Sequence, residues 1–139
     1  MDAISTRLII GLGLALGTVA ATVSASPVDT KEAPPLRPGY DRCLAQAQGV
    51  TLSLNNCIGT EFDFQDRRLN TAYKSLRESL SDAGRRALRD QERAWIADRD
   101  KACAPPADGG TAAMLGANEC RLNRTALRAA ELEAQRIHP

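Results

Sequence analysis

The chain has 139 residues, a length that fits a single domain. Its 18 lysines and arginines nearly balance its 17 aspartates and glutamates, which excludes the strong basic excess that nucleic-acid-binding proteins usually carry. Because only 4% of the residues are aromatic, a folded core must consist mainly of aliphatic side chains and alanine.

Residues 1–25 have the features of an export signal peptide. A basic residue precedes an apolar run from Leu8 to about Val23, and small side chains follow up to Ala25, where cleavage is expected. The run is shorter than the roughly 20 residues that a spanning helix needs, so cleavage is favoured over an uncleaved anchor. No cysteine follows it before Cys43, so no lipid attachment is expected. We therefore expect a periplasmic or secreted bacterial product without membrane attachment.

A proline-rich segment separates this signal from the rest of the chain. Residues 26–39 contain four prolines and few apolar side chains, so the segment cannot bury enough surface to fold alone. We expect residues 26–39 to form a disordered linker and residues 40–137 to form the folded domain.

From residue 40 onward the apolar residues recur at helical spacings. A short helix is expected over 41–48, with Gly49 as its C-cap. Three long helices should follow. The first ends near Leu80, the second stops at the prolines after Ala104, and the third begins beyond a Gly-Gly turn. Their expected N-caps are Thr51, then Ser81 or Asp82, then Thr111.

Each long helix carries one stripe of residues that we expect to face the core. The stripes are Leu54, Ile58, Phe62, Leu69, Tyr73, Leu76 and Leu80; then Leu88, Glu92, Trp95, Ile96, Arg99 and Cys103; then Leu115, Leu122, Thr125, Ala129 and Leu132. No stretch alternates like a strand, and the connections are short. The predicted fold class is therefore all-α, a small antiparallel bundle of three main helices plus a short N-terminal helix, cross-linked by two disulfides.

The four cysteines should pair, because an exported chain meets an oxidising compartment. A disulfide needs its Cα atoms within about 4.4–6.8 Å, so Cys43 and Cys57 can pair only if the chain reverses between them, as Gly49 allows. The Pro and Gly residues between Cys103 and Cys120 allow the same reversal. We favour these two local pairs. The alternative, Cys57 with Cys103 and Cys43 with Cys120, stays open in an antiparallel hairpin. Redox-active or zinc-binding thiols are not expected, since no C-x-x-C motif occurs.

The sequence offers little material for catalysis. The single histidine is His138, at the end of the chain, which argues against a histidine-based triad or metal site. Two carboxylate clusters exist, Glu61 with Asp63 and Asp66, and Asp98 with Asp100; we interpret both as solvated helix faces. No phosphate-binding glycine loop or nucleophile elbow occurs. We expect a protein that is not an enzyme and needs no metal or cofactor.

Several polar residues fall on or beside the apolar stripes. Gln91, Trp95 and Arg99 follow one another at intervals of four and should share a helix face. If that face packs on the first long helix, Asp66 or Asn70 could meet Arg99 or Gln91. Such a contact is expected because a buried charge needs a partner. We favour an internal polar network that fixes helix register; the alternative is an exposed Trp/Arg recognition patch.

These residues and the cysteines together carry a family resemblance. Their order is Cys43-Leu-Ala-Gln-Ala, Leu54-Asn-Asn-Cys57, Asp66-x-x-Leu69-Asn70-x-x-Tyr73, Leu88-x-x-Gln91-x-x-x-Trp95-Ile96-x-x-Arg99-Asp100, Cys103, Gly109-Gly110-Thr111, Cys120, Thr125 and Arg128. From about residue 43 to 132 the chain resembles the lysozyme inhibitor LprI-like N-terminal domain family. The resemblance implies an exported helical domain with disulfides that binds and inhibits lysozyme.

Two functions follow as expectations. The first is a protein-binding inhibitor of lysozyme or another cell-wall hydrolase, in which the loop from Ala104 to Gly110 would enter the enzyme cleft. The second is a periplasmic structural or stress-related interaction module with another protein partner and no inhibitory activity. Neither involves nucleic acid.

Overall fold

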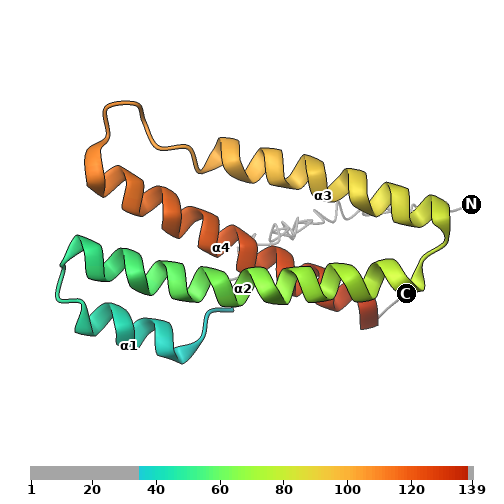
Figure 1. Ribbon diagram of the computed structural model, residues 1–139, viewed down its shortest axis with the longest axis horizontal. Coiled ribbons are helices and arrows are strands. Elements are labelled where there is room, and N and C mark those ends of the chain that lie inside the picture. Colours follow the sequence, from blue (N-terminus) through green and yellow to red (C-terminus); the bar gives the residue numbers. More distant parts are fainter. Residues whose placement is uncertain (1–34, 138–139) are drawn as a thin grey trace, which may run out of the picture. The chain divides into compact units, whose positions relative to one another are not determined.

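The computed structural model describes residues 35–137, which form four helices (Figure 1). These are α1 (Pro38–Gln46), α2 (Thr51–Ser79), α3 (Asp82–Ala102) and α4 (Gly110–Ile137). No strand occurs in this range, so the predicted all-α class is confirmed. None of the described helices has an apolar stretch long enough to span a membrane. The predicted signal peptide and residues 26–34 of the predicted linker lie outside the described residues.

Helices α2 and α4 form the most closely packed pair. They run side by side in the same direction, and α3, which connects them in sequence, runs in the opposite direction on the outer side of α4, so successive helices are antiparallel as predicted (Figure 1). Two alanines on α4, Ala126 and Ala129, are completely buried. Because helices approach more closely where the contact residues are small, these alanines explain the tight α2–α4 packing.

The core has two parts along the bundle. One cluster lies beside α1 and consists of Tyr40, Ala47, Cys57, Ile58 and Leu122. The other lies toward the α2–α3 turn and consists of Leu69, Ala72, Leu76, Leu88, Ala129 and Leu132. The residues predicted for the stripes of α2 and α4 are all buried or half-buried, so those two stripes are confirmed.

Helix α3 is attached along a narrower face than predicted. Leu88 and Glu92 are its only buried residues, and Trp95 is half-buried against the second core cluster. Ile96, predicted for the stripe, is 44% exposed. It lies about 100° around the helix from Trp95, and α3 rests on its neighbours along a single row of side chains, so Ile96 is turned outward.

The helix ends agree with the prediction in part. Ser81 is the N-cap of α3, and its side-chain oxygen accepts a hydrogen bond from the Gly84 backbone N–H at 3.3 Å. Thr51 is not a cap, because α2 already begins there and its N-cap is Val50. Thr111 is likewise inside α4, which begins one residue earlier.

Helix α1 begins and ends earlier than predicted. It starts at Pro38, since proline at the first helical position has a pre-set φ and needs no N–H partner. After α1 the chain reverses through Gln48 and Gly49, whose φ values are +48° and +79°. Glycine tolerates this left-handed conformation, so Gly49 provides the predicted reversal before α2.

Candidate functional site

Both disulfides lie at one end of the bundle. Cys43–Cys57 joins α1 to α2 with 5.7 Å between Cα atoms, and Cys103–Cys120 joins the end of α3 to α4 with 5.5 Å. The favoured local pairing is therefore confirmed, and the alternative pairing is wrong. The turn between α1 and α2 and the loop between α3 and α4 lie at this same end, which we call the disulfide end (Figure 1).

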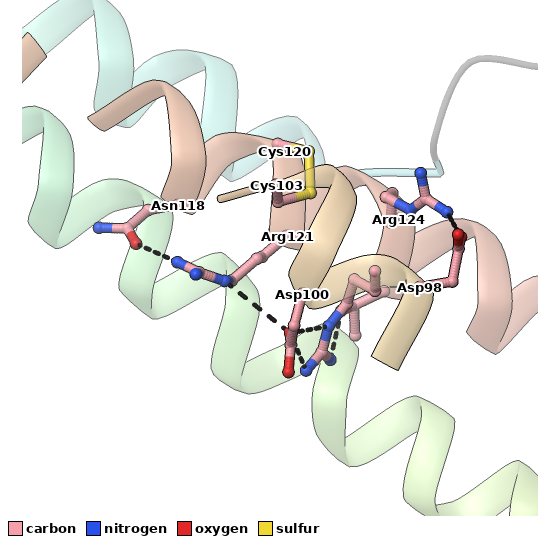
Figure 2. Close-up of a disulfide and its surroundings, with 9 residues drawn as sticks. Asp98, Asp100, Cys103, Asn118, Cys120, Arg121 and Arg124 are labelled. Atoms are coloured by element: carbon pink, nitrogen blue, oxygen red, sulfur yellow. Dashed lines mark hydrogen bonds and ion pairs between the residues drawn. A yellow bond between two sulfur atoms is a disulfide. The ribbon is translucent and has the colours of Figure 1, made fainter. Parts of the chain in front are cut away.

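Acidic residues near Cys103–Cys120 are paired with arginines (Figure 2). Asp98 on α3 pairs with Arg124 on α4. Asp100 pairs with Arg99 at 2.9 Å and lies 3.9 Å from the Arg121 side chain. The predicted carboxylate pair Asp98 and Asp100 thus contributes to a partly exposed ion-pair network between α3 and α4.

Trp95 and Arg99 share a face of α3, as predicted. The Arg99 guanidinium lies 5.1 Å from the centre of the Trp95 ring, and its side chain is 15% exposed. Its Nη1 is 3.5 Å from the Thr125 hydroxyl on α4. Gln91 is exposed. This face therefore rests on α4, and it forms neither a fully buried network nor an open recognition patch.

The predicted contact of Asp66 or Asn70 with α3 does not form. Asn70 donates a hydrogen bond to the Asp66 carboxylate on its own helix at 2.8 Å, and Asn70 is exposed. Asn70 follows Leu69 by one residue and so points about 100° away from the core-facing row of α2. Tyr73, on the inner side of α2, packs against the second core cluster instead.

A buried ion pair between α3 and α4 was not predicted as a pair. Arg128 Nε donates to Glu92 Oε1 at 3.0 Å, and Nη1 donates to Glu131 at 2.7 Å. The Arg128 and Glu92 side chains are 7% and 9% exposed. Burial acts to lower the pKa of Arg128, but the hydrogen bonds and charges of Glu92 and Glu131 outweigh it and raise that pKa above its usual value. The only sequence signal was the position of Glu92 on an apolar stripe.

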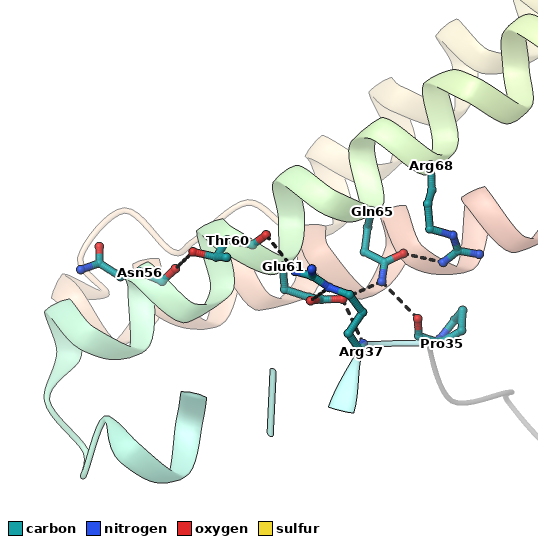
Figure 3. A network of polar contacts seen from close by, with 7 residues as sticks. All are labelled: Pro35, Arg37, Asn56, Thr60, Glu61, Gln65 and Arg68. Atoms are coloured by element: carbon teal, nitrogen blue, oxygen red, sulfur yellow. Dashed lines mark hydrogen bonds and ion pairs between the residues drawn. The ribbon is translucent and has the colours of Figure 1, made fainter. Parts of the chain in front are cut away.

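A second polar network surrounds Glu61 on α2 (Figure 3). Glu61 is 1% exposed and accepts hydrogen bonds from the Arg37 backbone N–H at 3.0 Å and from Arg37 Nε at 2.7 Å. The buried Gln65 donates to Glu61 and to the Pro35 carbonyl at 3.1 Å. Pro35 and Arg37, which lie within the predicted linker, thus make hydrogen bonds to buried residues of α2. The interpretation of Glu61 as part of a solvated helix face is wrong, because its carboxylate is buried and accepts hydrogen bonds from Arg37.

The buried carboxylates and the cysteines are all engaged with partners inside the described part of the protein. Within residues 35–137 no group of three or more His, Cys, Asp or Glu side chains could hold a metal ion. Glu61 and Glu92 are each neutralised by an arginine, and all four cysteines are in disulfides. Within the described residues these groups therefore connect the helices to one another and to the segment before α1.

A groove lies between the first halves of α2 and α4. The Asn118 side chain on α4 donates a hydrogen bond to Asn55 on α2 at 2.8 Å. This amide bridge lies between two adjoining hollows, an outer one at the disulfide end and an inner one that reaches Phe62 and Arg121. We call these two hollows together the α2–α4 groove.

The comparison with protein families agrees with this architecture. The family model described as lysozyme inhibitor LprI matches residues 43–132. No curated protein and no solved structure gives a significant match to the chain. The matched segment contains all four cysteines, both disulfides and the packed parts of α2, α3 and α4. The chain belongs to the lysozyme inhibitor LprI family.

Proposed function

We propose that this protein is an exported binding domain that inhibits a lysozyme or a related cell-wall hydrolase. The observation that carries the proposal is the family match, which covers most of the folded helical unit, including both disulfides. Family members are described as lysozyme inhibitors, and an inhibitor acts by binding a protein partner. A rigid helical unit with an accessible groove suits that role, because a preorganised surface loses less conformational entropy on binding.

We also propose that the protein acts outside the cytoplasm, in the periplasm or after secretion. Two disulfides support this location, since reducing pathways keep cytosolic thiols unpaired. The predicted signal peptide over residues 1–25 supplies the export route. This location would bring the protein to the enzymes that degrade the cell wall.

The charges are distributed unevenly along the bundle, although they nearly cancel in total. Residues that pair across helices, such as Asn55 with Asn118 and Glu92 with Arg128, lie at the same height along the bundle. These pairs allow the bundle to be divided into two halves. The disulfide half, residues 35–64 and 95–127, holds six Lys and Arg against seven Asp and Glu; the other half, 65–94 and 128–137, holds ten against seven. Many lysozymes are strongly basic, so steering favours an approach through the disulfide half.

A lysis assay tests the proposal. Purified disulfide-bonded protein is added at increasing molar ratio to a c-type lysozyme, and the clearing of a cell-wall suspension is followed by turbidity. We expect the rate of clearing to fall in proportion to complex formation, with direct binding measured in parallel by calorimetry. Unchanged lysis at a large molar excess, together with no heat of binding, would contradict the proposed function.

A further inference from the structure

Exposed hydrophobic side chains gather at the disulfide end. Four large hydrophobic residues are exposed within the described range: Val50, Leu52, Ile96 and Met114. Three of them lie at this end, where Leu52 at the start of α2 is 70% exposed and Met114 at the start of α4 is 49% exposed. Scattered exposed apolar residues need no explanation, but a cluster often marks an interaction surface.

The outer hollow of the α2–α4 groove is built from these side chains. Leu52, Met114 and Leu115 line it, and its lining is largely apolar apart from two threonines and the Asn55–Asn118 bridge. Two helices cross-linked to their neighbours by disulfides form its walls, so the apolar side chains stand on a rigid base. A rigid base lets such side chains act as anchors in a complex without a large ordering cost.

The inner hollow continues the groove past the amide bridge. It has a volume of about 200 Å³ and is lined by Ile58, Phe62 and Arg121 beside the two asparagines. Arg121 is 31% exposed, and its guanidinium lies between Asn118 and Asp100 (Figure 2). No aspartate or glutamate lines either hollow, and Arg121, whose guanidinium lies 3.9 Å from Asp100 outside the groove, is the charged residue of the lining.

Gly59 also lines the inner hollow. It lies inside helix α2, where glycine costs roughly 1 kcal/mol relative to alanine. A Cβ atom at this position would meet no atom of a neighbouring element within 4 Å, so the packing of the bundle does not require glycine. A side chain added at Gly59 would therefore extend into the space beside the inner hollow.

We propose that the α2–α4 groove is the surface that docks on the cleft of the hydrolase. The inference rests on the proposed function and adds the binding surface to it. Leu52 and Met114 would pack on the apolar wall of the cleft. Arg121 would face the cleft carboxylates, since glycosidases of this kind use a pair of them. A groove whose lining carries one arginine and no acidic side chain is complementary to such a cleft.

Leu52→Glu combined with Met114→Glu tests the apolar part of the groove. Both side chains are exposed, so the double variant should keep the wild-type circular dichroism and Tm. Central apolar anchors dominate interfaces, so we expect c-type lysozyme to bind at least about 30-fold more weakly and lysis to resume. Ile96→Glu is the matched control, because Ile96 is an exposed hydrophobic residue that lines neither hollow, and it should inhibit like wild type.

Two further pairs test the inner hollow. Gly59→Gln fills it, whereas Gly116→Gln places the same side chain at an equally open glycine of α4 that lines neither hollow. Arg121→Gln removes the groove cation, whereas Arg124→Gln removes a neighbouring arginine outside it. We expect at least about tenfold weaker inhibition in the first member of each pair only.

The outcomes separate this inference from the proposed function. If the wild-type protein neither binds nor inhibits the lysozyme, the proposed function fails and the docking surface fails with it. If wild type inhibits and the groove variants inhibit equally well, the proposed function stands and the groove is not the docking surface. Equal losses in groove variants and their controls would also contradict the inference.

Discussion

Tyr40 is a buried residue with an ionisable side chain. It is 5% exposed in the first core cluster, and its hydroxyl has no hydrogen-bond partner among residues 35–137. Burial, together with the nearby charges of Glu119, Asp41 and Glu61, raises the pKa of Tyr40 to about 12. The neutral phenol is thus favoured in the folded state, which links stability to alkaline pH.

We predict that this linkage is visible above pH 10. The folded-state pKa is raised, so its stabilising effect is complete below about pH 10 and is lost as the pH rises toward about 12. A pKa raised from 10.0 to about 12 corresponds to a loss of up to about 3 kcal/mol in the free energy of unfolding. Tyr40→Phe should remove this loss and be at least as stable at neutral pH. Denaturant unfolding at several pH values measures it, and Tyr73→Phe, which keeps Tyr40, should behave like wild type.

We predict that substitutions of Glu92 and Arg128 have strongly coupled effects on the free energy of unfolding. Arg128→Met leaves the Glu92 carboxylate buried without its partner, so we expect a loss of about 3–5 kcal/mol in unfolding free energy. Adding Glu92→Leu should recover most of that loss. Arg124→Met on the same two helices breaks the exposed pair with Asp98 and should cost less than about 1 kcal/mol. Purely additive effects of the Glu92 and Arg128 changes in a double-mutant cycle would contradict the assignment.

At the scale of elements, the two outer helices depend on the disulfides to different degrees. Helix α1 packs on the bundle through the first core cluster, to which Tyr40 and the adjoining Ala47 belong. The last turns of α3 expose Ile96 and are joined to α4 chiefly by Cys103–Cys120 and by ion pairs at the surface. Few buried contacts imply a low free energy of local opening.

Removing each disulfide should therefore loosen a different element. In the Cys103→Ala/Cys120→Ala variant, hydrogen exchange should accelerate in the C-terminal half of α3 and in the following loop. In Cys43→Ala/Cys57→Ala it should accelerate in α1 while α3 stays protected. The closed loops span 14 and 17 residues, so each removal should cost about 3 kcal/mol in the chain-entropy model. Exchange that rises evenly over the bundle in both variants would argue against this division.

At the scale of the whole molecule, the folded unit extends beyond the helices. Residues 35–37 form no helix, yet the Pro35 carbonyl and Arg37 supply hydrogen bonds to the buried Gln65 and Glu61 (Figure 3). The stability of the bundle therefore depends on a segment that has the composition of a linker.

A pair of shortened chains tests this boundary. A chain that begins at residue 40 should be less stable than one that begins at residue 35 by about 1–3 kcal/mol, because Glu61 loses charge-assisted hydrogen bonds. Adding Glu61→Gln to the shorter chain should recover part of the difference, since an uncharged amide is less costly to bury. Thermal and denaturant unfolding measure both effects. Equal stability of the two lengths would show that residues 35–39 contribute nothing to the fold.

The sequence determined the properties that depend on local rules. Apolar spacing predicted the stripes of α2 and α4, proline and glycine predicted the breaks between helices, and the reversal at Gly49 made Cys43–Cys57 feasible. Ser81 could also be recognised as a cap. These features depend on neighbours within a few residues, and those neighbours can be read along the chain.

Only the tertiary structure decided the features that depend on distant partners. Local spacing could not show that Glu92 meets Arg128, that Glu61 is buried beneath Arg37, or that Ile96 turns outward. It also left open which cysteines pair. The physical reason is that burial and ion pairing depend on how far apart whole helices pack and which row of each faces its neighbour. The α2–α4 groove belongs to this group, because its two walls are about 60 residues apart in sequence and meet only in the bundle.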